Sequence, residues 1–229
     1  MKRTSLLLTA AIAVLSFSAC TDAPESDAAK TSDAQAAATA AGEAYTVDTA
    51  ASKIEWIGTK VTGHHQGSLP IKSGTLNVQG GNVVSGEFVL AISGLSVTDG
   101  NDVDANNKLR GHLLSPDFFD AENHPEGKFV VTGVQPFSGT VTDSSDKAQE
   151  GISKYRVSDP THTISGNLTL KGVTKNVTFP AKVTVTGNGV EALAKFNINR
   201  KDWNIVYAGK PDDLIRDNVH LGISLKANK

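Results

Sequence analysis

Residues 163–186 read TISGNLTLKGVTKNVTFPAKVTVT, and this stretch decides the fold class. Apolar or small residues alternate with polar ones through 163–170, and the same alternation runs through 177–186. A period of two residues is typical of β-strands. Strands with one apolar and one polar face belong to antiparallel sheets. The intervening residues 171–176, KGVTKN, read as a turn, so the stretch predicts a strand, a turn and a second strand.

Other segments on both sides carry the same pattern or are rich in strand-forming residues. They lie at residues 53–61, 72–78, 83–92, 127–134, 194–199 and 221–226. Turn sequences such as Gly80-Gly81-Asn82 and Gly187-Asn188-Gly189 separate several of them. With the first two strands they make about eight, which predicts one all-β domain over residues 45–229.

One segment interrupts the strands. Residues 106–114 suit a short helix, and Ser115-Pro116 then reads as an N-cap followed by proline at the first helical position. We therefore expect a helical insert over residues 104–123, which also carries Phe118 and Phe119.

About eight antiparallel strands leave two sheet edges that must be protected. Closing the sheet into a barrel removes both edges. An eight-stranded barrel has an interior just wide enough for side chains or for one small ligand. A sandwich of two sheets is the alternative, and periodicity alone does not choose between them.

The first twenty residues read as a secretion signal. Lys2 and Arg3 precede a mostly apolar stretch, residues 6–17, which is too short to cross a bilayer as a helix but suits a signal peptide. Its end, Phe17-Ser18-Ala19-Cys20, resembles the bacterial lipobox, with Phe17 where leucine is usual. The resemblance implies a lipoprotein signal peptide over 1–20 and lipid on Cys20. An ordinary cleaved signal followed by a stray thiol is the alternative.

Residues 21–44 read as a flexible tether. They contain ten alanines and five acidic residues, with no aromatic side chain and no apolar residue larger than alanine. Such a segment buries too little surface to offset the entropy of ordering it. We expect it to hold the domain off a membrane without docking on it.

Composition and motifs exclude several classes of function. The formal charge of −2 offers no basic excess for nucleic acid, and the single cysteine excludes an intrachain disulfide and cysteine-based metal clusters. The six histidines lack the spacing of a metal site, and residues 99–110 lack the ligands of a calcium loop. We find no nucleophile or phosphate-loop motif. We therefore expect no enzyme activity, no cofactor and no metal.

Four segments together resemble the YceI-like family. They are residues 56–67, residues 109–120 with His124-Pro125 and Phe129, residues 164–178, and residues 196–205. Asn167 and Asn176 stand where that family usually has Asp and Pro. Both read as strand-surface or turn positions, so we expect no effect on function.

The resemblance implies a lipocalin-like antiparallel barrel around a long apolar cavity. It implies binding of a long-chain amphiphile such as a polyisoprenoid, a quinone, or a fatty acid or its amide. Members are exported, no catalytic chemistry is generally assigned to them, and they often form dimers. We therefore expect a membrane-anchored lipoprotein of the periplasm or cell envelope, with a lipid or isoprenoid ligand and a homodimer as possible partners.

Alternation and the resemblance together name the cavity residues. They are Trp56, Phe88, Leu90, Ile92, Leu109, Phe118, Phe119, Phe129, Val131, Leu168, Leu170, Phe179, Phe196, Ile198, Ile223 and Leu225. His65 and His112 are candidates to touch a polar head group at the barrel mouth.

An ordinary packed core explains these apolar faces better when the pattern is taken alone. Gly58, Gly86, Gly133 and Gly166 interrupt the inward faces and favour a hollow, as does the resemblance. The competing interpretation is an envelope structural or stress-associated protein with a filled core and no ligand.

Overall fold

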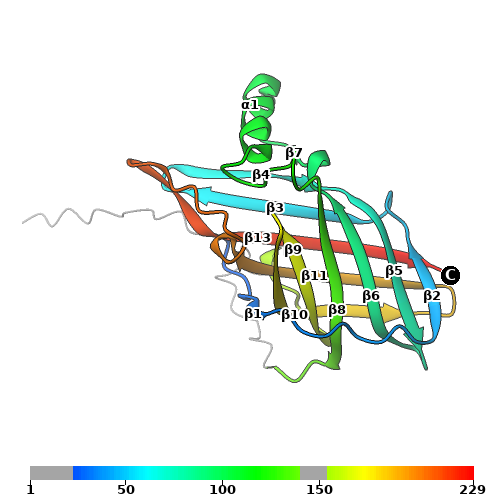
Figure 1. The fold of residues 1–229 in the computed structure, drawn as a ribbon. Helices are drawn as coiled ribbons and strands as arrows, with labels where there is room; N and C mark the ends of the chain where they lie inside the picture. The colour runs from blue at the N-terminus through cyan, green and yellow to red at the C-terminus, as the bar shows by residue number, and fades with distance from the viewer. Residues whose placement is uncertain (1–22, 140–153) are drawn as a thin grey trace, which may run out of the picture.

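The computed structural model describes residues 23–139 and 154–229, and strands dominate it (Figure 1). The strands of the first half are β1 (Lys30–Asp33), β2 (Glu43–Val47), β3 (Lys53–Lys60), β4 (Gly63–Leu69), β5 (Ile71–Gln79), β6 (Asn82–Ala91) and β7 (Ser96–Val97). Those of the second half are β8 (Glu126–Pro136), β9 (His162–Leu170), β10 (Val173–Val185), β11 (Gly189–Asn199), β12 (Gly209–Lys210) and β13 (Asp213–Asn228). The helical elements with assigned bounds are α1 (Val103–Leu114) and two 3-10 turns, η1 (Ile92–Gly94) and η2 (Arg200–Trp203).

Eight antiparallel strands close into a barrel. The pairing runs from β10 through β9, β8, β6, β5, β2, β13 and β11, and β11 pairs back with β10. This confirms the expected barrel over a sandwich. All eight segments expected as strands lie in strands, although the last residue of three of them, Val61, Ile92 and Thr186, falls just outside. β2 pairs with β13 only at Ala227–Asn228, and β3 pairs with the preceding part of β13. β4 pairs with β3 and β7 pairs with β4, so β3, β4 and β7 extend the barrel wall as a flap.

The strand connections gather at two ends of the barrel. One end, here called the helix end, carries residues 61–62, 92–125, 171–172 and 200–212, and therefore α1 and η2. The other, here called the far end, carries the tight turns at 80–81 and 186–188. Within residues 23–139 and 154–229, no helix has the length and apolar character needed to cross a membrane.

Helix α1 stands at the helix end and is tied to the barrel by Arg110. Its N-cap is Asp102, whose carboxylate accepts the Ala105 N–H at 2.9 Å. Arg110 donates to the carbonyls of Leu95 and Ser93, at 2.8 and 2.7 Å. These two charge-assisted bonds fix the helix over the link between β6 and β7.

The second helix expected after Ser115-Pro116 does not form. Ser115 instead ends α1, and the N–H groups of Phe118 and Asp120 donate back to its carbonyl at 3.0 and 2.9 Å. The N–H of Phe119 donates to Leu113. The N–H groups after Ser115 thus donate back to the last carbonyls of α1 in a series of turns. The chain therefore does not start a new helix here.

The expectation that residues 21–44 do not dock on the domain is wrong for the described part. Residues 23–42, here called the N-terminal belt, run along the outside of the barrel (Figure 1). β1 pairs with residues 175–178 of β10, and Asn197 of β11 exchanges backbone hydrogen bonds with Asp27 and Ala29. β10 and β11 pair with each other only at 181–185 and 190–194, so β1 occupies the place between them toward the helix end.

Two asparagines hold the middle of the belt. Asn167 on β9 accepts the Gln35 N–H at 3.0 Å and donates to the Gln35 carbonyl at 2.7 Å. Asn176 on β10 is buried and donates to Asn167 at 3.0 Å and to Thr132 at 2.9 Å. The Ala38 N–H then reaches the Val131 carbonyl at 3.0 Å. Backbone groups and short amide side chains form these bonds, so they need no large apolar residue.

Candidate functional site

The barrel encloses a cavity of about 550 Å³. This volume lies within the range of pockets that bind small organic ligands. Most of its wall is aliphatic or aromatic, contributed by the inward faces of the strands and by the segment from α1 to Phe119.

At the far end, the cavity is closed. Its lining residues there, Ile54, Leu76, Val83 and Val190, are all buried. Tyr45 on β2 is also buried, and its hydroxyl lies 3.5 Å from the Gly187 carbonyl in the turn between β10 and β11. The far end is therefore a packed floor.

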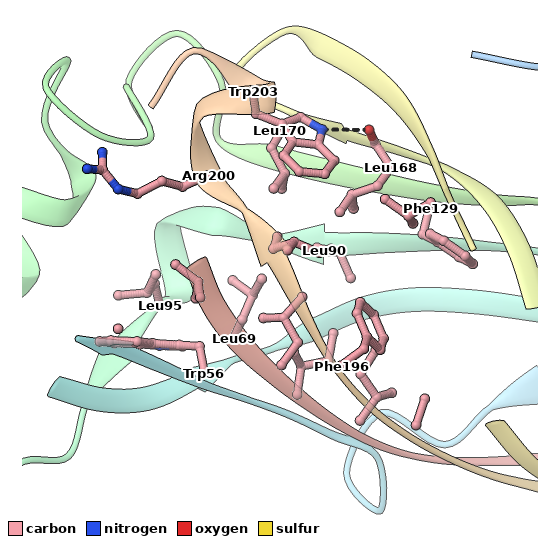
Figure 2. Close-up of a pocket in the computed structure, with 18 of the residues that line it drawn as sticks. Trp56, Leu69, Leu90, Leu95, Phe129, Leu168, Leu170, Phe196, Arg200 and Trp203 are labelled. Carbon is pink, nitrogen blue, oxygen red and sulfur yellow. Dashed lines mark hydrogen bonds between the residues drawn. The ribbon is translucent and has the colours of Figure 1, made fainter. Parts of the chain in front are cut away.

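A column of four aromatic rings crosses the interior from β6 and β8 to β10 and β11. Phe179 and Phe196 stack with ring centroids 4.0 Å apart, and Phe129 lies 6.0 Å from Phe179 and 6.1 Å from Phe88. Figure 2 shows Phe129 and Phe196 on facing walls of the cavity. These rings provide a continuous apolar surface.

The inward glycines contribute less space than expected. An added Cβ at Gly166 would meet the Phe129 ring at 2.2 Å, and one at Gly86 would meet Leu76 at 2.7 Å, so neighbouring side chains already fill both positions. Of these four glycines only Gly58 lines the cavity, and a Cβ added there would lie 3.9 Å from the nearest atom, in the Trp56 ring. Gly133 faces open space but lies outside the lining.

Polar residues gather where the cavity meets the helix end. They are Lys60, His65, His112, Arg200, Tyr207, Lys210 and Asp213. Lys210 both lines the cavity and is exposed, so the cavity opens to the surface here, and we call this opening the mouth. Lys60 donates to Asp213 at 2.6 Å, and this bond is the main reason that the pKa of Asp213 is lowered.

Two residues of η2 close the wall beneath the mouth. Trp203 is fully buried and its indole N–H donates to the Leu168 carbonyl at 2.9 Å (Figure 2). Arg200 is buried and donates to the carbonyls of Ile205, Arg216 and Ile215, at 2.6, 3.0 and 3.3 Å. Burial lowers the pKa of Arg200, against the opposing charge of Asp217. Its donors are used on backbone carbonyls, so its role is to hold the chain around the mouth.

Fifteen of the sixteen side chains named from the sequence line this cavity. They are Trp56, Phe88, Leu90, Leu109, Phe118, Phe119, Phe129, Val131, Leu168, Leu170, Phe179, Phe196, Ile198, Ile223 and Leu225. Ile92 is the exception, because β6 ends at Ala91 and the chain turns into η1. Ile92 is instead buried in the core, close to Gly127.

Both histidines proposed for a head group line the mouth. His65 Nδ1 lies 2.5 Å from Asp99, and His112 Nε2 lies 3.0 Å from Asp117. His112 also meets the Phe118 and Tyr207 rings edge-on at 5.0 and 4.9 Å. Cys20, the proposed lipid attachment, lies outside the described residues.

Sequence reasoning missed the other polar groups of the mouth. Lys60 and Arg200 lie in two of the segments that resemble the family but were not singled out. Tyr207, Lys210 and Asp213 sit in or beside connections that carry no motif, and only the fold brings these groups together. Among residues 23–139 and 154–229, no three histidine, cysteine, aspartate or glutamate side chains converge as a metal site would require.

Comparison with known proteins adds a family and a fold. The family model described as YceI-like domain matches residues 45–227. A UPF0312 protein of Yersinia enterocolitica is 36% identical over 118 residues, and one of Pseudomonas putida is 36% identical over 78 residues. These matches cover 48% and 34% of this chain. The matched stretches span half the length of the Yersinia protein and 29% of the Pseudomonas protein.

Two solved structures share the barrel. BcnA of Burkholderia cenocepacia superposes with a TM-score of 0.58 at 19% identity, over 80% of this chain and 99% of that one. A polyisoprenoid binding domain from Saccharophagus degradans, implicated in plant cell wall breakdown, gives a TM-score of 0.54 at 16% identity, over 80% of this chain and 97% of that one. At these identities the likeness establishes the fold alone.

Proposed function

The chain belongs to the YceI-like domain family, and on that premise we propose that its barrel binds a long-chain amphiphile. The observation that carries the proposal is the apolar cavity, which has a packed floor at the far end and a polar mouth at the helix end. A hydrocarbon chain lying in it removes apolar surface from water on both sides, at about 25 cal/mol per Å².

The arrangement favours one orientation of the ligand. The chain lies along the aromatic column, and the polar head stays at the mouth near His65, His112 and Tyr207. A polyisoprenoid, a quinone, or a fatty acid or its amide has this shape. The structural likeness to a polyisoprenoid binding domain supports the first of these.

We propose further that the protein is exported and held to a membrane of the cell envelope through lipid on Cys20. The support is the lone cysteine at the end of a signal-like stretch. Cys20→Ser is expected to abolish incorporation of labelled fatty acid and to release the protein from membranes. Continued labelling of the variant contradicts the anchor and leaves the cavity proposal intact.

Extraction of the purified protein tests the ligand. Protein isolated from its native membranes is treated with organic solvent, and the extract is analysed by mass spectrometry. We expect one class of long-chain lipid in a fixed ratio to protein, in place of a sample of the membrane's bulk lipids. A protein that carries no lipid, and takes up none when offered the extracted membrane lipids, is the filled-core envelope protein instead.

A further inference from the structure

Four large apolar side chains are exposed at the helix end; one of them, Val103, begins α1, and the other three come from two neighbouring strand connections. Val61, Val206 and Leu214 have 41%, 61% and 46% of their surface exposed, and we call these three residues the rim. The Val61 N–H donates to the Leu214 carbonyl at 3.2 Å, so the β3–β4 and β12–β13 connections lie side by side. The Ile215 N–H donates to Ala208 at 2.9 Å, which brings the loop with Val206 to the same place.

The rim borders the mouth of the cavity. Lys60 precedes Val61, Tyr207 follows Val206, and Asp213 and Ile215 flank Leu214; all four of these neighbours line the cavity. An apolar chain leaving the cavity therefore emerges beside exposed apolar side chains. Exposed apolar groups gathered at one site mark a surface that meets a partner or a membrane.

The N-terminal belt begins at the same end. Ala23, Pro24 and Ser26 lie against Arg216, Asp217 and Asn218, at the helix-end half of β13. Asn197 fixes this start by donating to the Pro24 carbonyl at 2.9 Å. Two residues separate Ala23 from Cys20, and the three residue steps span at most about 10 Å. An attachment at Cys20 would thus hold the helix end, and not the far end, next to the bilayer.

Charges near the rim are largely balanced. Lys60 pairs with Asp213 at 2.6 Å, and Lys201 pairs with Asp217 at 2.8 Å. The surface therefore lacks the basic excess that would draw it to anionic lipid or to an acidic polymer. Its chemistry fits shallow insertion of apolar side chains among lipid chains.

From these observations we propose that the rim is a membrane-docking surface that inserts into the bilayer, so that the mouth opens directly onto it. The docking goes beyond ligand binding and does not depend on which molecule fills the barrel. It gives an amphiphile a path between membrane and cavity that avoids water.

Depth-dependent quenching tests this docking. The full mature protein is labelled with an environment-sensitive fluorophore at Leu214→Cys, at Val206→Cys or, as a control in the β10–β11 turn at the far end, at Asn188→Cys. Each is reconstituted into phosphatidylcholine vesicles that contain lipid with a nitroxide on its acyl chain. Strong quenching at the two rim positions and little at Asn188 is the expected result. Equal quenching at both ends, or none at the rim of vesicle-bound protein, overturns the proposal.

Rim variants separate insertion from anchoring. Val61→Asp with Val206→Asp, in the protein labelled at Leu214→Cys, is expected to reduce quenching about tenfold, because burying such side chains is strongly favourable. Leu193→Asp on the outer wall of β11 is the matched control and is expected to change nothing. The wild-type protein, whose only cysteine is Cys20, is treated with the same thiol-reactive fluorophore. Labelling there means that Cys20 is free and that the anchor proposal fails, whereas unchanged quenching in the rim variants means that the docking proposal fails. Equal quenching at Leu214→Cys with and without the two aspartate substitutions contradicts the proposal.

Discussion

Leu168 serves the barrel with both its side chain and its backbone. The side chain lines the cavity, and the carbonyl accepts the Trp203 indole. In a filled core, a larger residue here strains the packing by about 1–3 kcal/mol. In a hollow that holds a flexible chain, the added atoms replace ligand atoms. We therefore expect Leu168→Trp to lower the lipid bound per protein, measured by mass spectrometry, while the delipidated protein loses little stability in denaturant.

Thr169 provides the matched control for this variant. It follows Leu168, faces away from the cavity and shares a hydroxyl hydrogen bond of 2.8 Å with Thr174. Thr169→Trp is expected to leave the lipid content nearly unchanged. Strong destabilisation by Leu168→Trp, together with no lipid in any of the proteins, would mean a filled core.

His220 links the folded state to pH. It is 4% exposed on β13, and its Nδ1 lies 3.0 Å from Asn197 Oδ1 beneath the belt. Burial, helped by the charge of Lys195, lowers its pKa from 6.5 to about 4. As the pH falls, the His220 imidazole is protonated in the unfolded chain before it is protonated in the folded protein. The contribution of the neutral His220 to stability is therefore fully present above pH 6.5 and is lost as the pH is lowered toward 4. The loss is up to about 3 kcal/mol.

Denaturant unfolding between pH 7 and pH 4 measures this loss. His220→Gln keeps an amide donor for Asn197 and removes the titration, so its stability is expected to change less over the same range. His64→Gln, at an exposed position of β4, is the control and should behave like the wild type. Parallel pH curves for wild type and His220→Gln would show that His220 does not set the dependence.

At the scale of elements, the N-terminal belt alters the expected behaviour of the barrel. β1 stands between β10 and β11 where these two strands separate, so the belt is part of the wall. A chain that starts at Tyr45 loses these backbone bonds and exposes the polar groups that they satisfied. We expect its thermal midpoint to fall by several degrees below that of a chain starting at Ala23, since about 1 kcal/mol shifts a domain of this size by 2–4 °C.

A single substitution tests the same contact more gently. Asn167→Ala removes both hydrogen bonds to Gln35 and is expected to cost about 1 kcal/mol. Hydrogen exchange should then rise in residues 23–39 while β9 stays protected. An unchanged midpoint in the truncated chain would restore the idea of a passive tether.

The strands missed from the sequence include β2, which buries Tyr45 and Val47 but is only five residues long. Two others, β1 and β4, share one property. β1 reads KTSD and β4 reads GHHQGSL, and neither has an apolar face for alternation to reveal. β1 pairs with β10, and β4 pairs with β3 and β7, so backbone hydrogen bonds to neighbouring strands define both of them. Asn167 and Asn176, set aside as surface positions, turn out to hold the belt, and only the folded structure brings Gln35 to them.

In the candidate site, too, the sequence pattern predicts one part, the cavity wall, better than another, the polar mouth. Alternation placed the cavity wall because side chains two residues apart share a face of a strand. It failed at Ile92, one residue past the end of β6, where the period no longer applies. Of the polar mouth only His65 and His112 were predicted. Lys60 at the end of β3 is far in sequence from Tyr207 and Lys210, and only the fold brings them together.

At the scale of the whole molecule, the barrel combines a packed floor with an open mouth. The core around Tyr45, Val190 and Ala227 closes the far end without a ligand. The middle of the barrel encloses about 550 Å³, a volume that side chains do not fill. A ligand that occupies this space binds the folded state alone, because the unfolded chain has no cavity.

Ligand removal should therefore destabilise the protein. A ligand present at 100 times its dissociation constant stabilises the fold by about 2.7 kcal/mol, which corresponds to roughly 5–10 °C for a domain of this size. Calorimetry of the native protein, of the delipidated protein and of the delipidated protein with its extracted lipid restored measures this. We expect the midpoint to fall on delipidation and to recover on restoration, and both changes to be smaller in Leu168→Trp. If the thermal midpoint of the wild-type protein does not change on delipidation, the lipid is bound outside the barrel.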